Sequence, residues 1–121
     1  MATDSNMTGV ISETAVIHAL SKLGYGVSIP IGKERYDLIA TKPNEVHRVQ
    51  VKTARHTDRG YVKVCIINGS IKPYDGSNVD AFAVYDPVTE DVYWMWYDET
   101  PDTQVNRLLE SWQRHLISDK L

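Results

Sequence analysis

The sequence predicts an α/β (α+β) domain spanning residues 1–121, in which a helix near each end of the chain flanks a central mixed β-sheet. Two observations predict this class. Apolar residues recur at helical spacing near the two ends, and the stretch between them breaks into short β-prone segments separated by turn residues. Apolar residues make up 42% of the chain and charged residues 24%, so one core of normal size can be buried.

The first predicted element is a helix that Thr8 caps and Gly24 ends. Its apolar residues lie largely along one stripe, as expected of a helix that covers a sheet. They are Val10, Ile11, Val16, Ile17, Ala19, Leu20 and Leu23. A short strand over residues 25–29 follows, and Pro30 stops it.

Five further strands and a C-terminal helix complete the order. The strands predicted over residues 35–40 and 46–54 are joined by the turn residues Lys42, Pro43 and Asn44 and therefore form a hairpin. More strands are predicted at 61–67, 79–85 and 91–97. Helical spacing then marks a C-terminal helix over about 103–117, with apolar positions at Val105, Leu108, Leu109, Trp112 and Leu116.

The strand over 46–54 carries the most informative pattern. Alternate residues share a face of a strand, so Gln50 and Lys52 project side by side, roughly 7 Å apart, while Val49 and Val51 suit packing against a helix. In the predicted hairpin, Asp37 comes close to that polar pair. A carboxylate buried in an apolar stretch needs a cation, which is either a metal or a side chain such as Lys52 in a purely structural salt bridge.

The order of Asp37 followed one hairpin later by Gln50, Val51 and Lys52 resembles the PD-(D/E)XK nuclease superfamily. Gln50 stands where most members carry an acid, as in the subgroup that includes intron-encoded homing endonucleases. Residues 9–13, which contain Glu13, are similar to the first helix of archaeal Holliday junction resolvases. Residues 79–85 and 92–93 resemble later strands of the Gln-containing subgroup, so the likeness runs from Gly9 to about Tyr97.

This resemblance implies a restriction-endonuclease-like core and a metal-dependent active site. Glu13, Asp37, Gln50 and Lys52 are the implied catalytic residues. Glu13, Asp37, the Gln50 side-chain oxygen and the Val51 carbonyl would hold Mg²⁺, for which Mn²⁺ substitutes. Lys52 would orient the attacking water or stabilise charge on the phosphate.

The implied function is that of a magnesium-dependent DNA endonuclease, with three alternatives for what it does to DNA. A homodimeric Holliday junction resolvase that cuts four-way junctions is expected first. The other nuclease alternative is a site-specific duplex endonuclease of the homing or restriction type. A DNA-binding protein of this fold that does not cut is the third, and Gln50 is the only feature that favours it.

The charge distribution is compatible with DNA as a partner, although the net charge is −3. Residues 22–72 carry a local net charge of +6, and the rest of the chain carries −9. Five residues in the basic segment are candidates for contacting the DNA backbone; they are Lys33, Arg35, Arg55, His56 and Arg59. The alternative for each is an ordinary solvated surface residue.

Residues 93–97 place large side chains on both faces of a predicted strand. They suit either a stacking platform for bases or core packing combined with a subunit interface, and we expect a dimer interface here because the acidic stretch 98–102 would repel DNA. Cys65 is the only cysteine, and the first residues show no signal peptide or apolar span. An intracellular protein, cytoplasmic or nucleoid-associated, is therefore expected, without a membrane partner and with a viral or mobile-element origin left open.

Overall fold

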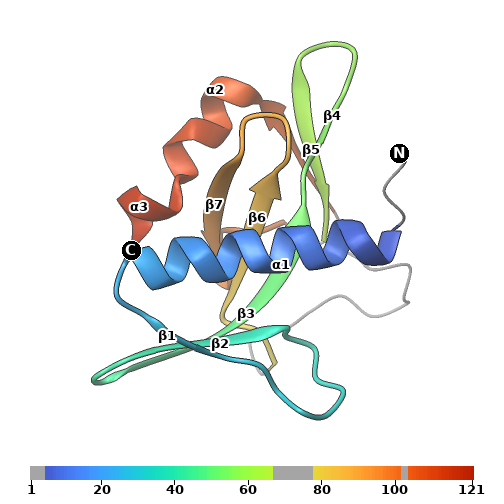
Figure 1. The fold of residues 1–121 in the computed structure, drawn as a ribbon. Helices are drawn as coiled ribbons and strands as arrows, with labels where there is room; N and C mark the ends of the chain where they lie inside the picture. Colours follow the sequence, from blue (N-terminus) through green and yellow to red (C-terminus); the bar gives the residue numbers. More distant parts are fainter. Residues whose placement is uncertain (1–4, 67–77, 102–103) are drawn as a thin grey trace.

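The computed structural model describes residues 5–66, 78–101 and 104–121, and it contains a mixed sheet with helices packed on it (Figure 1). The main sheet has the strand order β1-β2-β3-β6-β7, and a smaller sheet has the order β4-β5-β8. The strands are β1 (Gly26–Ser28), β2 (Leu38–Lys42), β3 (Glu45–Thr53), β4 (Arg55–His56), β5 (Tyr61–Cys65), β6 (Ala81–Asp86), β7 (Asp91–Trp96) and β8 (Gln104–Leu108). The helices are α1 (Ser5–Lys22), α2 (Leu109–Trp112) and α3 (Ile117–Lys120), with 3₁₀ turns at Tyr97–Glu99 and Gln113–His115. The predicted fold class is confirmed.

Helix α1 covers one face of the main sheet (Figure 1). Val16 and Leu20 are fully buried and belong to the same core cluster as Val49 and Val51 of β3. Gly24 ends the helix with a positive φ of 89°, as predicted, because a residue without a Cβ adopts this conformation freely. Thr8 lies inside the helix and is not its cap, since the helical hydrogen bonding extends back to Ser5.

Strand β3 lies at the centre of the main sheet. It pairs antiparallel with β2, with Leu38 opposite Val49, and parallel with β6, with Val51 opposite Ala83. The β2–β3 turn contains Asn44 at a φ of 68°, which suits a tight hairpin. A parallel pair requires a crossover, and the chain between β3 and β6 uses it to build β4 and β5.

The smaller sheet packs on the other face of the main sheet. Alternation along β6 puts Ala81 and Ala83 in the core cluster under α1, and it puts Phe82 and Val84 in a second cluster. The second cluster also contains Val62, Val64, Tyr93, Met95, Val105 and Trp112. The main sheet is thus covered on both faces.

The C-terminal segment differs from its prediction as one helix over 103–117. Residue 103 lies outside the described residues, and residues 104–108 form strand β8, in which Val105 pairs with Val64 of β5. Helical geometry starts only at Leu109 and is interrupted at Leu116, which bridges to Tyr93 of β7. Pairing with β5 buries Val105 in the second cluster, and this long-range packing outweighs the helical spacing.

Most side chains of the aromatic strand β7 are buried within the chain, and β7 is an edge strand of the main sheet. Tyr93, Trp94 and Met95 are fully buried within the chain, because α1 covers one face of β7 and the second core cluster covers the other. Only Trp96 and Tyr97 of this segment remain partly exposed. Dimer formation stays a prediction. No helix within the described residues is long and apolar enough to cross a membrane.

Candidate active site

The polar face of β3 matches the predicted alternation. Val49 and Val51 are buried under α1, whereas Gln50 and Lys52 are half-exposed on the opposite side of the strand. Gln50 lies opposite Phe82 of β6, and Lys52 lies two residues further along the same face. Strand geometry alone therefore presents the amide and the ammonium side by side.

Asp37 is the residue directly before β2, and the backbone of β3 holds it in two ways. Its N–H donates to the Val49 carbonyl at 2.8 Å, and its Oδ2 accepts from the Val51 N–H at 2.9 Å. Since the β2–β3 ladder begins at Leu38, the backbone of Val51 faces the Asp37 side chain and has no ladder partner in β2. Burial raises the pKa of Asp37 above its ordinary value, although the Val51 N–H and the charge of Lys52 act in the opposite direction.

Two further groups share the electrostatic field of this carboxylate. Burial raises the pKa of Glu13 on α1, and the charge of Asp37 raises it further. Burial lowers the pKa of Lys52, while the negative charge of Asp37 opposes that shift. The neighbour of Glu13, Ser12, is buried and places its hydroxyl 2.5 Å from that of Thr53, so α1 is fixed against the end of β3 that carries Lys52.

The donor set in this region fits a hard divalent cation. The predicted ligands are the carboxylates of Glu13 and Asp37, the side-chain oxygen of Gln50 and the backbone carbonyl of Val51, which are the kinds of oxygen ligand that Mg²⁺ prefers. Burial is the main cause of the raised pKa of both carboxylates, and the negative charge of Asp37 adds to the shift of Glu13. No cluster of three or more His, Cys, Asp or Glu suitable for a metal occurs within the described residues, which is consistent with an amide at position 50 in place of a third acid.

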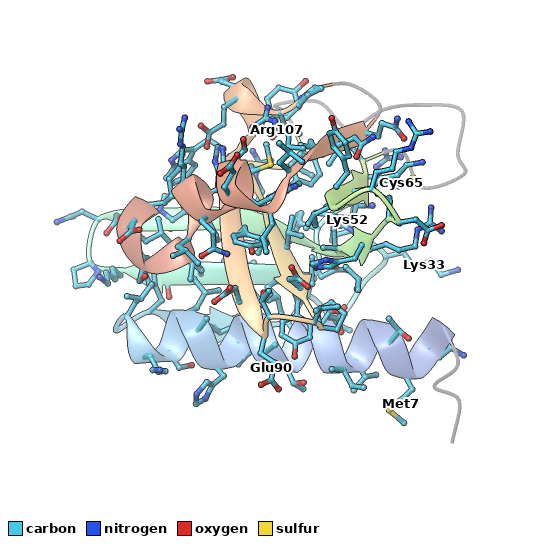
Figure 2. The ribbon with its side chains drawn as sticks, turned by 90° about the horizontal axis from the view of Figure 1, so that it is seen from above. Met7, Lys33, Lys52, Cys65, Glu90 and Arg107 are labelled. Atoms are coloured by element: carbon cyan, nitrogen blue, oxygen red, sulfur yellow. The ribbon has the colours of Figure 1, made fainter. Side chains whose placement is uncertain are left out.

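The predicted DNA-contacting cations differ in how deeply they are buried. Arg35 is half-buried and close enough to Lys52 to help lower its pKa. Lys33, Arg55 and Arg59 are exposed. In Figure 2, Lys33 and Lys52 are labelled on the same side of the molecule.

His56 has a protein partner that the sequence did not indicate. Its Nε2 lies 2.8 and 2.9 Å from the two carboxylate oxygens of Asp86, which is fully buried at the end of β6. Asp86 also accepts from the N–H groups of Val88 and Thr89. This arrangement holds β4 against β6, so His56 acts in the structure as an anchor and not as an outward-facing phosphate ligand.

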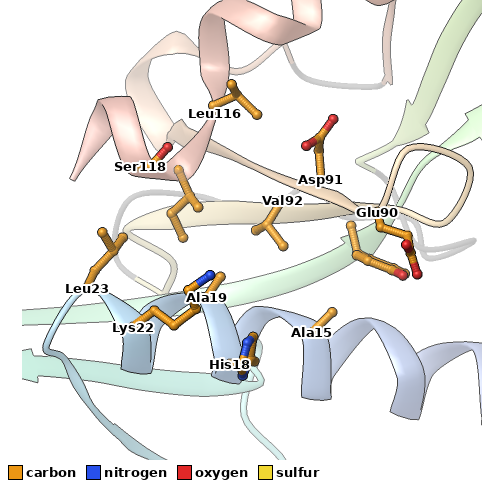
Figure 3. Close-up of a pocket in the computed structure, with 12 residues that line it drawn as sticks. Ala15, His18, Ala19, Lys22, Leu23, Glu90, Asp91, Val92, Leu116 and Ser118 are labelled. Carbon is orange, nitrogen blue, oxygen red and sulfur yellow. The ribbon is translucent and has the colours of Figure 1, made fainter.

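One hollow of the molecule lies away from these residues. It has a volume of about 390 Å³ and opens between the C-terminal half of α1 and the C-terminal segment, with His18, Lys22, Asp91 and Ile117 among its lining residues (Figure 3). No predicted catalytic residue lines it. The candidate active site is instead the neighbourhood of Asp37, beside the middle of α1, where Glu13 lies.

Comparison with known proteins bears on the family and the fold of the chain. Residues 3–115 match the family described as PD-(D/E)XK endonuclease. The chain belongs to this family. No curated protein sequence matched the chain.

The fold of this PD-(D/E)XK endonuclease is similar to the solved structure of a bacterial homing endonuclease, I-Ssp6803I. The TM-score is 0.74 at 22% sequence identity, covering 88% of this chain and 77% of the other. Together the two comparisons confirm the superfamily and the core architecture that the sequence motif implied. The chain is a nuclease, and DNA is the substrate that its family implies.

Proposed function

We propose that this endonuclease is a divalent-metal-dependent endodeoxyribonuclease whose active site consists of Glu13, Asp37, Gln50 and Lys52. The observation that carries the proposal is the setting of Asp37. Its half-buried carboxylate is oriented by the Val51 N–H and lies in the field of a second carboxylate, Glu13, and of Lys52. A perturbed cluster of this kind is typical of a functional site.

The chain's own residues have separate tasks in this proposal. Glu13, Asp37, Gln50 and the Val51 carbonyl would hold Mg²⁺, for which Mn²⁺ substitutes, and the ion would supply a water of lowered pKa and positive charge at the phosphate. The Val51 N–H keeps the Asp37 carboxylate in one orientation. Lys52 stabilises negative charge that develops on the phosphoryl oxygens, and the nearby Asp37 favours its protonated form.

Two substrates are supported by different observations. The structural similarity to a homing endonuclease, together with Gln50, favours a defined site in duplex DNA. The resemblance of residues 9–13 to Holliday junction resolvases favours the four-way junction. We place the duplex site first, because its support extends over the whole core, and keep the junction as the second candidate. Either substrate suits a two-fold dimer that presents one active site to each strand.

Cleavage assays separate these alternatives. Wild type and Asp37→Ala are compared on mobile and immobile four-way junctions, on linear duplex of the same sequence and on a randomised duplex pool, each with Mg²⁺ and with EDTA. Asp98→Ala, which removes an exposed carboxylate outside the site, serves as the matched control.

The expected result is metal-dependent cutting of particular duplexes by wild type and Asp98→Ala, with loss of cutting in Asp37→Ala. Cutting confined to junctions identifies a resolvase. Tight binding without cutting under any divalent metal identifies a non-cleaving DNA-binding protein and refutes the proposal.

A further inference from the structure

The smaller sheet turns one of its faces away from the core. Along β5, Val62 and Val64 are buried, while Tyr61 and Cys65 are exposed and Lys63 is half-exposed between them. Strand β8 alternates in the same way around the buried Val105. The residues of the three strands on this outward face are Arg55, Tyr61, Lys63, Cys65, Gln104, Asn106 and Leu108.

Strand pairing arranges these side chains in rows. Lys63 of β5 lies opposite Arg55 of β4 on one side and opposite Asn106 of β8 on the other, and Cys65 lies opposite Gln104. Like charges directly opposite one another destabilise a sheet. Neither Arg55 nor Lys63 forms an ion pair with any residue that the structure describes. The pair therefore suits an anion from outside the chain.

A hollow at this pair connects it with the active site. Its volume is about 210 Å³, and Thr53, Arg55, Lys63 and Cys65 line it. Thr53 directly follows Lys52 in β3, and Cys65 is close enough to Lys52 to act on its pKa. Figure 2 labels Lys52 and Cys65 on the same side of the molecule. The outward face thus begins beside the candidate active site.

The charge and the strand spacing of the outward face favour duplex DNA as its occupant. The outward face carries two cations and no acid, although the chain as a whole has more acids than bases. Two neighbouring strands such as β5 and β8, spaced by about 4.8 Å, have the width of the two-stranded ribbon that the major groove of about 12 Å admits. The β4–β5 hairpin extends beyond the body of the main sheet, where a groove can reach it (Figure 1).

We propose that the outward face of the β4-β5-β8 sheet reads duplex DNA beside the cleavage site. Arg55 and Lys63 hold a backbone phosphate in the hollow between them, and the exposed amides of Gln104 and Asn106 contact base edges in the major groove. Amide side chains pair with the N6 and N7 of adenine, so adenine is the base expected at the contacted positions. The position of this reading relative to the cut rests on the proposed function, whereas the binding itself does not require cutting.

The His56–Asp86 contact explains how Arg55 is directed. Strand β4 has two residues, whose side chains point in opposite directions. His56 is held by the buried carboxylate of Asp86, and this fixes the strand with Arg55 on the outward face. His56 is therefore a positioning residue for the phosphate contact.

Selection of bound duplexes from a randomised pool, in EDTA, tests the proposal independently of cleavage. The amide variant is Gln104→Met with Asn106→Leu, which keeps the side-chain shapes and removes the hydrogen-bonding groups. The cation variant is Arg55→Ala with Lys63→Ala, and Lys22→Ala on the far part of α1 is the control. Unchanged circular dichroism spectra and thermal midpoints show that each variant is folded.

Each variant has its own expected signature. The amide variant loses discrimination of about 5- to 150-fold at individual base pairs, while its affinity for random duplex stays within a few-fold of wild type. The cation variant binds all sequences more weakly and lowers the salt dependence of binding by about one to two ions, without changing the preferred sequence. His56→Gln weakens binding to all sequences in the same way but to a smaller extent than the cation variant. Lys22→Ala matches wild type.

An unchanged sequence preference in the amide variant overturns the proposal, and so does failure of the wild type to bind duplex. If the amide variant alters the preference while no metal produces cutting, the reading face stands and the proposed nuclease function fails. If wild type cuts in an Asp37-dependent way and the amide variant keeps the same cleavage sites, the nuclease function stands and the reading face is refuted.

Discussion

Strand β3 lies between two aspartates in matching backbone settings. Asp37 precedes β2 on one side, and Asp80 precedes β6 on the other. Each donates its N–H to a β3 carbonyl, Asp37 to Val49 at 2.8 Å and Asp80 to Arg48 at 2.9 Å. Each carboxylate accepts a β3 N–H, from Val51 at 2.9 Å and from Arg48 at 2.7 Å respectively.

The two carboxylates differ in the charge that faces them. Asp80 receives the Arg48 guanidinium through Nε at 3.0 Å and Nη2 at 2.9 Å, and this hydrogen bonding lowers the pKa of Asp80. Burial raises the pKa of Asp37, and no salt bridge joins it to a residue in the described part of the chain. Its other electrostatic neighbour, Glu13, adds negative charge.

The comparison shows how one backbone arrangement serves two purposes. An aspartate whose counter-charge is supplied by the chain stabilises the fold, as Asp80 does. An aspartate that the backbone holds in the same way, but that no guanidinium neutralises, can bind a cation from solution. We propose this role for Asp37. The two cations of β3 differ in the same way: Arg48 is structural, and we propose that Lys52 is catalytic.

The largest expected effect concerns those two cations. Lys52→Met lowers the single-turnover cleavage rate by about 10²–10³-fold, because it removes the positive charge that stabilises the phosphoryl oxygens. Arg48→Met keeps the rate within a few-fold of wild type at a temperature where it is folded. Comparable losses in both variants would contradict the division between a catalytic and a structural cation.

For the stability of the fold, we expect Asp80 to matter more than Asp37. Asp80→Asn lowers the free energy of unfolding by about 2 kcal/mol, since it weakens charge-assisted hydrogen bonds that are partly screened by solvent. Asp37→Asn leaves the stability of the metal-free protein unchanged or raises it by up to about 1 kcal/mol, because a neutral oxygen still accepts the Val51 N–H. Urea unfolding in EDTA measures both. A destabilised Asp37→Asn would show that this carboxylate is structural.

Divalent metal should stabilise the wild type through Asp37. Mg²⁺ at ten times its dissociation constant raises the free energy of unfolding by about 1.4 kcal/mol. Asp37→Asn loses this gain, whereas Asp80→Asn retains it although its starting stability is lower. Thermal unfolding with Mg²⁺ and with EDTA gives the comparison, and equal gains in the two variants would move the metal site away from Asp37.

The smallest effect is the pH dependence of stability without metal. Because the folded pKa of Asp37 is raised above its ordinary 3.8, its favourable contribution exists below that value and is lost as the pH rises through the raised pKa. Asp80 has a lowered pKa, so its contribution is present above 3.8 and is lost as the pH falls through the lowered value. Between about pH 3 and pH 7, the unfolding free energy of Asp37→Asn should therefore increase relative to that of wild type as the pH rises. The deficit of Asp80→Asn should disappear at the acidic end.

The sequence was sufficient to bring Asp37, Gln50 and Lys52 of the proposed site together, because these residues are close in the chain. Alternation along β3 places Gln50 and Lys52 together, and a short hairpin brings Asp37 to the same strand. Glu13 is more remote in the chain, and only the resemblance to known nucleases singled it out. The sequence pattern did not indicate that the Val51 N–H orients the Asp37 carboxylate, which the structure shows.

Long-range packing accounts for the predictions that differ from the structure. Residues 104–108 have helical spacing, but β5 has a free side that pairs with them and buries Val105. The aromatic pattern of β7 suited both core packing and a subunit interface; the structure shows the core packing of Tyr93, Trp94 and Met95, and the interface stays a prediction. The contact of His56 with Asp86 joins residues 30 positions apart, and no pattern in the sequence indicates that these two residues meet.

The most direct test of the central claim applies cleavage and unfolding assays to the same two variants, Asp37→Asn and Asp80→Asn. We expect a crossed pattern. Asp37→Asn loses metal-dependent cleavage of DNA and keeps its stability, and Asp80→Asn keeps cleavage and loses stability. Cleavage that survives in Asp37→Asn, measured with Mg²⁺ on a substrate that the wild type cuts, would contradict the assignment of the active site.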